Sequence, residues 1–220
     1  MVKIKGGKGV VNSFFEEGVT HIFELPGVYT LEIYDALYDR LDDVELVTVK
    51  HESNASIMAD VYGRLTGEPG ICLVTTGPGA TNSLTGVGEA YGAASPMVHI
   101  SSSVSRDGPS MEVHGLYDKK FTEKTFKPVT KWSTTVQEVS EVHDTLSKAF
   151  EIARTPKKGP VHIDFPRDVL SESAEVNPYI TRKIKLNIPD EKLLKDIASV
   201  LADSVRPVIC LGDHIDLTLR

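Results

Sequence analysis

The sequence has few of the residues and patterns that mark several protein classes. Its two cysteines, Cys72 and Cys210, are too few for a disulfide framework, and because each lies in an apolar run, buried reduced thiols are expected. No stretch has the length and apolarity of a transmembrane helix, and the first six residues lack the apolar core of a secretion signal. A reducing cytoplasm is therefore the expected location.

Positive charge is also scarce relative to negative charge. Lysine and arginine total 24 against 31 aspartate and glutamate residues, which gives a net charge of −7. No strong basic field exists to attract nucleic acid or an anionic membrane surface. Partners of both kinds are therefore not expected.

Short apolar runs alternate with amphipathic stretches along most of the 220 residues. The runs predict strands near 21–25, 44–49, 70–74, 97–101, 130–136 and 161–165. The amphipathic stretches predict helices near 8–17, 30–41, 52–65, 80–93 and 139–153, with Thr30 as a cap for the second and Gly67 ending the third. This alternation predicts an α/β fold, a parallel sheet with helices on both faces.

The pattern changes near residue 170. Residues 1–170 are expected to form one domain, and the polar, turn-rich stretch 171–189 is expected to be a linker. Residues 190–220 are interpreted as the truncated start of a second α/β domain, with a helix from Asp190 to about 202 and a strand over 206–212. The polar stretch 102–120 is long for a simple connection, and such loops are often functional.

Three polar or glycine-rich segments follow predicted strands. They are Pro26-Gly27, the acid Glu52 at the start of a helix, and the turn over residues 75–82. Ligands bind at the carboxyl ends of strands in open α/β sheets, so these segments form a candidate site.

Each segment also has a plain structural interpretation. The turn around Gly77 has neither the GxGxxG spacing of a dinucleotide fold nor the Lys-Ser/Thr of a phosphate-binding loop. Glu52 alone is a first-turn acid that complements a helix dipole, and Pro26-Gly27 alone is a turn. Their occurrence together, in order, in one domain is what favours a functional site.

Longer blocks of sequence identify a family. The segments VKHESNASIMADVYGRLTG (49–67), GICLVTTGPGATN (70–82), KPVTK (127–131) and GPVHIDFPRDV (159–169) resemble the N-terminal domain of acetolactate-synthase-like thiamine diphosphate enzymes. The resemblance covers nearly the whole chain. It implies the thiamine-diphosphate-binding fold, with this domain holding the pyrimidine ring of the cofactor.

The resemblance also implies roles for individual residues. Glu52 is the catalytic residue, which hydrogen-bonds N1′ of the pyrimidine and so activates the cofactor. His51 is expected to pack or to hydrogen-bond rather than to catalyse. His114 is a substrate-contacting candidate, with Glu112 as its rival. Besides Glu52, the expected cofactor-binding residues are Pro26, Gly27, Thr75, Pro78 and Asn82.

Two departures from the family pattern stand beside the site. Relatives commonly have Gly where this chain has Glu24, and a small residue where it has Val28. Both bring bulk, and Glu24 brings charge, toward the expected cofactor face, which puts the usual substrate in question.

Other functions of the family are expected to lie outside this chain. Relatives hold the diphosphate and Mg²⁺ through a Gly-Asp-Gly motif in another domain, whereas Gly212-Asp213 is followed here by His214. No metal ligand is therefore expected in this chain, and any FAD site depends on the middle domain. The resemblance implies a homo-oligomer, a dimer or a tetramer, and a diphosphate-binding domain in cis or in trans.

The leading hypothesis is half of an enzyme that decarboxylates a 2-keto acid and joins or releases the resulting acyl anion equivalent, and that is inactive as this chain alone. A piece of a longer chain is favoured. One alternative is the pyrimidine subunit of a two-subunit 2-keto acid decarboxylase. Another is a non-catalytic binding module on the same fold.

Overall fold

A computed structural model of the protein describes residues 1–107, 118, 120–184 and 189–210. Its main feature is a six-stranded sheet in the order β3-β2-β4-β5-β7-β6, in which every neighbouring pair is parallel. The strands are β2 (His21–Leu25), β3 (Glu45–Thr48), β4 (Gly70–Val74), β5 (Met97–Ser103), β6 (Trp132–Thr135) and β7 (Pro160–Pro166). This sheet confirms the predicted α/β fold.

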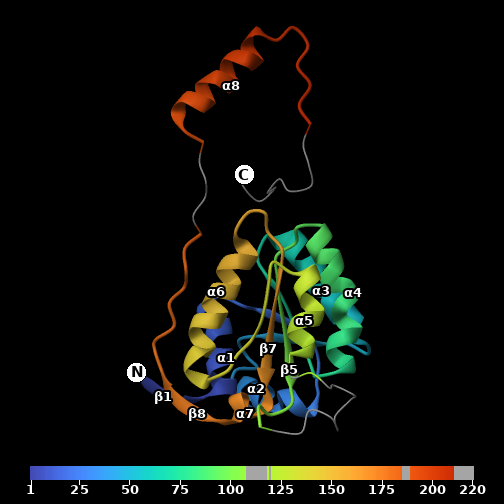
Figure 1. Ribbon diagram of the computed structural model, residues 1–220, viewed down its shortest axis with the longest axis vertical. Helices are drawn as coiled ribbons and strands as arrows, with labels where there is room; N and C mark the ends of the chain where they lie inside the picture. Colours follow the sequence, from blue (N-terminus) through green and yellow to red (C-terminus); the bar gives the residue numbers. More distant parts are fainter. Residues whose placement is uncertain (108–117, 119, 185–188, 211–220) are drawn as a thin grey trace.

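Helices cover both faces of the sheet (Figure 1). Successive strand residues point to opposite faces, so β4 contributes Ile71 and Leu73 to one apolar cluster and Cys72 and Val74 to the other. The first cluster packs under α1 (Gly6–Glu16), α2 (Leu31–Tyr38) and α6 (Val142–Arg154), and the second under α3 (Glu52–Thr66), α4 (Pro78–Gly92) and α5 (Phe121–Phe126). All five residues of β4 are buried, as its continuous apolar run predicts.

The expected helices are all present, but α2 ends at Tyr38 and not near 41, and α6 begins at Val142 after a 3₁₀ turn and not at 139. Gly67 ends α3 in the left-handed conformation, with φ 76°, as expected for a helix-stopping glycine. Thr30 precedes α2 but does not cap it, because its hydroxyl donates to the carbonyl of Gly27 at 3.0 Å. Thr30 is the last residue of a short 3₁₀ helix, Val28–Thr30, which directs its hydroxyl back toward Gly27 at the end of β2.

A second, antiparallel sheet pairs β1 (Val2–Lys5) with β8 (Ser173–Val176). It follows α7 (Arg167–Ser171) and lies inside the stretch that we expected to be a linker, so that expectation is wrong for these residues. Only Val176 of β8 is buried, because a two-stranded ribbon presents most of its side chains to water. The strand alternates polar and apolar residues, Ser-Ala-Glu-Val, but four residues within a polar stretch are too few for the alternation to stand out.

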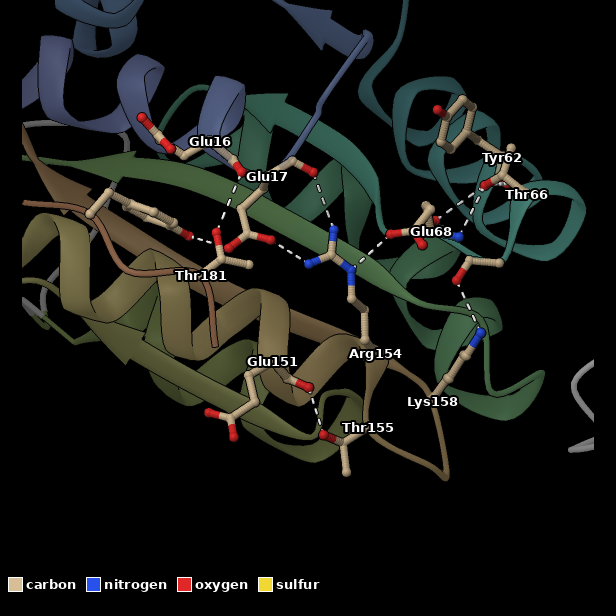
Figure 2. A network of polar contacts seen from close by, with 12 residues as sticks. Glu16, Glu17, Tyr62, Thr66, Glu68, Glu151, Arg154, Thr155, Lys158 and Thr181 are labelled. Carbon is tan, nitrogen blue, oxygen red and sulfur yellow. Dashed lines mark hydrogen bonds and ion pairs between the residues drawn. The ribbon is translucent and has the colours of Figure 1, made fainter. Parts of the chain in front are cut away.

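The segment after β8 is also held against the domain, by what we call the Arg154 cluster: Glu17, Glu68, Arg154 and Tyr179. Arg154 pairs with the buried carboxylate of Glu17 and, at 2.8 Å, with Glu68 (Figure 2). Tyr179 donates to the other oxygen of Glu17 at 2.6 Å. Burial, and then the hydrogen bond to Glu17, raise the pKa of Tyr179, so its hydroxyl remains a donor. Arg182, three residues on, pairs with Asp144 and Glu151 of α6.

Beyond this segment lies α8 (Glu191–Asp203), away from the parallel sheet (Figure 1). The Asp190 carboxylate accepts from the backbone amide of Leu193 at 2.7 Å, which confirms the predicted helix cap. Residues 206–210 form no strand, contrary to expectation, because no described strand lies beside them to share backbone hydrogen bonds. Cys210 is therefore exposed and not buried as expected, whereas Cys72 is buried.

Candidate functional site

The three segments singled out in the sequence meet at one edge of the sheet. Strands β3, β2 and β4 are neighbours and run in the same direction. Their carboxyl ends therefore bring together Gly27 after β2, Glu52 after β3 and Thr75 after β4.

Glu52 is the first residue of α3 and is half-buried. The side-chain amide of Asn82, in the second turn of α4, donates to Oε2 of Glu52 at 2.9 Å. The preceding His51 caps α3, since its Nδ1 accepts from the backbone amide of Ser53 at 3.3 Å. Glu52 thus sits at a helix N-terminus, as the plain interpretation expects, and is also oriented by a residue from a second helix.

Thr75 lies between two glycines that approach it closely. A Cβ on Gly27 would overlap the Thr75 side chain, 2.7 Å from its Cγ2. A Cβ on Gly79 would lie 2.8 Å from the same methyl and 3.5 Å from Oε1 of Glu52. Thr75 therefore fills the space over both glycines. Gly27, Thr75, Gly79 and Glu52 form one packed surface, in which a larger side chain at either glycine position would collide with Thr75.

One polar atom in this surface has no partner among the described residues. The Thr75 hydroxyl is buried and makes no hydrogen bond with any of them. An unpaired buried hydroxyl costs free energy, so it marks a place where a ligand or a water gains a hydrogen bond. This hydroxyl and the Glu52 carboxylate are the groups at this surface that suit a polar ligand.

Cys72 lies within electrostatic range of Glu52. Burial raises the pKa of the Cys72 thiol, and the charge of Glu52 raises it further. The thiol is therefore protonated and unreactive at neutral pH. Cys72 was expected to be buried, but its proximity to Glu52 was not recognised in the sequence.

Glu24 is not on the side of the sheet that holds Glu52, which corrects the expectation that it crowds the cofactor face. Its neighbours Phe23 and Leu25 point into the cluster beneath α3 and α4, so Glu24 points to the opposite face. There it is 1% exposed and accepts hydrogen bonds from Tyr34, at 2.6 Å, and from Thr48. Because these partners hold the carboxylate, its charge does not enter the site.

The remaining predicted residues are less enclosed. Pro26 and Pro78 are exposed at the edge of the site, where Pro78 opens α4. Val28 is also exposed. His114 and its rival Glu112 lie outside the described residues.

A buried polar group next to the site was missed. His99 of β5 and His162 of β7 lie side by side in the sheet and are both buried, and His99 contacts Ser83 of α4. The signal in the sequence was a histidine inside each of two apolar strands, at positions that later prove to be in register.

The described part of the chain contains no cluster of three histidine, cysteine, aspartate or glutamate side chains suited to a metal ion. None of its helices combines the length and apolarity needed to cross a membrane.

Comparison with known proteins identifies the family. The family described as thiamine pyrophosphate enzyme, N-terminal TPP binding domain, matches residues 4–126. The chain belongs to this family. Thiamine pyrophosphate is thiamine diphosphate under another name, and the matched range of the thiamine pyrophosphate enzyme domain contains every described site residue.

Several curated relatives of this thiamine pyrophosphate enzyme domain are named acetolactate synthases. The chain is 35% identical to a probable acetolactate synthase large subunit of Methanocaldococcus jannaschii and 38% identical to an acetolactate synthase of Bacillus subtilis. Both alignments cover 96% of this chain but 36% of the relative. An acetolactate synthase isozyme 3 large subunit of Escherichia coli is 37% identical over 82% of the chain. The chain thus spans about a third of the length of these relatives.

Proposed function

We propose that this chain is the pyrimidine-binding part of an enzyme of the acetolactate synthase type, which acts on 2-keto acids with thiamine diphosphate. The observation that carries the proposal is the contact between Asn82 and Glu52, on the surface formed with Gly27 and Thr75. Family membership supports the choice of cofactor.

The residues present fit the pyrimidine ring of that cofactor. Gly27 and Gly79 let the Thr75 side chain pack closely against their backbone, and the unpaired hydroxyl of Thr75 supplies a hydrogen-bonding group beside Glu52. Pro26 and Pro78 border the ring, as the family resemblance implies.

Glu52 holds and exchanges a proton at N1′ of the pyrimidine. Asn82 occupies Oε2 of the carboxylate, which fixes its rotation and leaves Oε1 on the Gly79 side for the ring nitrogen. When bound, thiamine diphosphate supplies the carbanion at the thiazolium C2 and the electron sink for decarboxylation. The carboxylate is suited to this role because it both accepts and returns a proton, which an amide does not.

The proposal includes what lies outside the described residues. His114 contacts the substrate. Residues 190–220 open a second domain, and a diphosphate-binding domain in cis or in trans holds the diphosphate and Mg²⁺, so the chain alone is inactive. The assembled enzyme is a cytoplasmic dimer or tetramer, and any FAD is held mainly by the middle domain.

Substitution of Glu52 tests the proposal in the assembled protein, in which this chain is joined by the diphosphate-binding domain. Glu52→Gln preserves shape and hydrogen bonding but exchanges no proton, so turnover of pyruvate with Mg²⁺ and thiamine diphosphate is expected to fall about 100-fold or more. Glu89→Gln is the matched control, because Glu89 is an exposed glutamate on α4 that pairs with Arg64. Equal turnover by Glu52→Gln and the unaltered protein would show that the catalytic assignment is wrong.

A further inference from the structure

A series of buried hydrogen bonds connects the sheet to the helix that carries Asn82. Nδ1 of His162, on β7, lies 2.8 Å from Nδ1 of His99, on β5. Nε2 of His99 lies 2.7 Å from the hydroxyl oxygen of Ser83, on α4. All three side chains are fully buried, and Phe126 of α5 stacks on both imidazole rings with centroid distances of 4.5 and 4.3 Å.

The hydrogen-bond pattern assigns the direction of every bond in the series. The Ser83 hydroxyl donates its one proton to the carbonyl of Ala80 at 2.7 Å, so it must accept from His99 Nε2. A neutral His99 then has a bare Nδ1, which accepts from Nδ1–H of His162. Nε2 of His162 is left as an acceptor, and it has no partner among the described residues.

Both rings are neutral, which this pattern requires. Burial lowers the pKa of His99 to about 3. Burial, and then the neighbouring His99, lower the pKa of His162 well below its ordinary value. At neutral pH each imidazole therefore keeps one proton, and each tautomer is fixed by its neighbour.

The series ends one residue from the contact that orients Glu52. Asn82 precedes Ser83 in α4, and Gly79, which packs against Thr75, lies in the first turn of the same helix. A shift of this helix by a fraction of an ångström would lengthen the 2.9 Å bond from Asn82 to Glu52. A buried bond to a strand of the central sheet opposes that shift, because breaking it would leave Nε2–H of His99 unpaired in an apolar core.

We propose that Ser83, His99 and His162 are positioning residues, which hold the first turns of α4 in register with the sheet and thereby keep Asn82 on Glu52. The inference rests on the proposed function, because its consequence is tight binding of thiamine diphosphate. None of the three touches the cofactor; they act through Asn82.

The test is the dissociation constant of thiamine diphosphate in the presence of Mg²⁺, measured by equilibrium dialysis on the assembled protein with its diphosphate-binding domain. Ser83→Ala leaves His99 Nε2–H unpaired and is expected to weaken binding about 10-fold. Ser13→Ala is the matched control. Ser13 is also a buried helical serine that donates to a backbone carbonyl, at 2.8 Å, but it lies on α1, on the opposite face of the sheet.

A double-mutant cycle separates positioning from a general loss of stability. If Ser83 acts through Asn82, then adding Ser83→Ala to Asn82→Ala is expected to weaken binding by less than about 2-fold further.

A second pair of variants, at His99, covers the case in which Ser83→Ala does not fold. His99→Gln retains an N–H near the position of Nε2 and is expected to bind within about 3-fold of the unaltered protein, whereas His99→Met, of similar length but without a donor, is expected to lose about 10-fold.

The outcomes are distinct. If the unaltered protein does not bind thiamine diphosphate, the proposed function falls and this inference falls with it. If the unaltered protein binds but Ser83→Ala matches Ser13→Ala, the positioning role alone is overturned. The same holds if the losses from Ser83→Ala and Asn82→Ala add, or if His99→Gln and His99→Met bind alike.

Discussion

Acid is expected to destabilise this protein through its buried histidines, and His99 gives a measurable share of the effect. Its folded-state pKa of about 3 lies below the ordinary value of 6.5. As the pH falls below 6.5, the unfolded chain therefore binds a proton at His99, whereas the folded protein does not. Stability from His99 is full above pH 6.5 and is lost between pH 6.5 and about 3.

The size of the effect follows from the two pKa values. Within the window the free energy of unfolding falls by about 1.4 kcal/mol per pH unit for one histidine. At pH 4.5 the loss due to His99 alone is on the order of 3 kcal/mol, a large part of the stability of an ordinary domain. His162 acts in the same direction. Asp164, whose pKa is raised by burial, acts in the opposite direction, because its folded form binds a proton that the unfolded form has released.

Comparison with His99→Gln isolates the contribution of His99, since Gln does not titrate. The free energy of unfolding is measured by urea titration at pH 7.5, 6.5, 5.5 and 4.5, following the fluorescence of the single tryptophan, Trp132. Below pH 6 the unaltered protein is expected to lose stability more steeply than the variant, by about 1.4 kcal/mol per pH unit. Parallel pH dependences would refute the assignment of a neutral, buried His99. Ser83→Ala is the control that retains His99. Its free energy of unfolding is expected to be lower than that of the unaltered protein by the same amount at each pH.

Three further changes test other parts of the structure. Gly27→Ala places a methyl against Thr75 and is expected to weaken thiamine diphosphate binding in the assembled protein at least 10-fold, measured by dialysis, whereas Gly92→Ala, with no atom within 4 Å of the new methyl, is expected to change nothing. Arg154→Met leaves the buried Glu17 carboxylate without its guanidinium partner, and urea titration is expected to show a loss of about 3–5 kcal/mol; a loss below 1 kcal/mol would contradict the importance of this pair. Asp190→Ala removes the cap of α8 and is expected to cost that helix about 1 kcal/mol, visible as reduced helical circular dichroism at 222 nm.

The sequence predicted the elements that are marked by a continuous apolar run, by a helical spacing of apolar residues or by a helix-ending glycine. The fully apolar run of β4 and the glycine that ends α3 both have one structural interpretation, and both were located correctly. Strand β8 was missed, because its burial depends on one partner strand from the other end of the domain. Its Ser-Ala-Glu-Val alternation is two periods long, which is too short to be told from chance.

The site was partly predictable for a related reason. Gly27, Glu52 and Thr75 each follow a strand, so parallel topology alone brings them to one edge. The direction of the Glu24 side chain and the bond from His99 to Ser83 depend on strand register and helix rotation, which single residues do not reveal. Local sequence thus predicted which segments meet at this edge of the sheet, and packing between elements decided which side chains face one another there.

The Arg154 cluster has a consequence for everything that follows it in the chain. Because Tyr179 and Arg182 contact the domain, the distance from the domain to α8 is counted from Arg182. The stretch from Arg182 to Asp190 reaches at most about 28 Å, even when fully extended. One helix confined to a sphere of that radius has a local concentration on the order of 20 mM. Any contact between α8 and this domain therefore forms as an intramolecular event, independent of how much of the protein the cell contains.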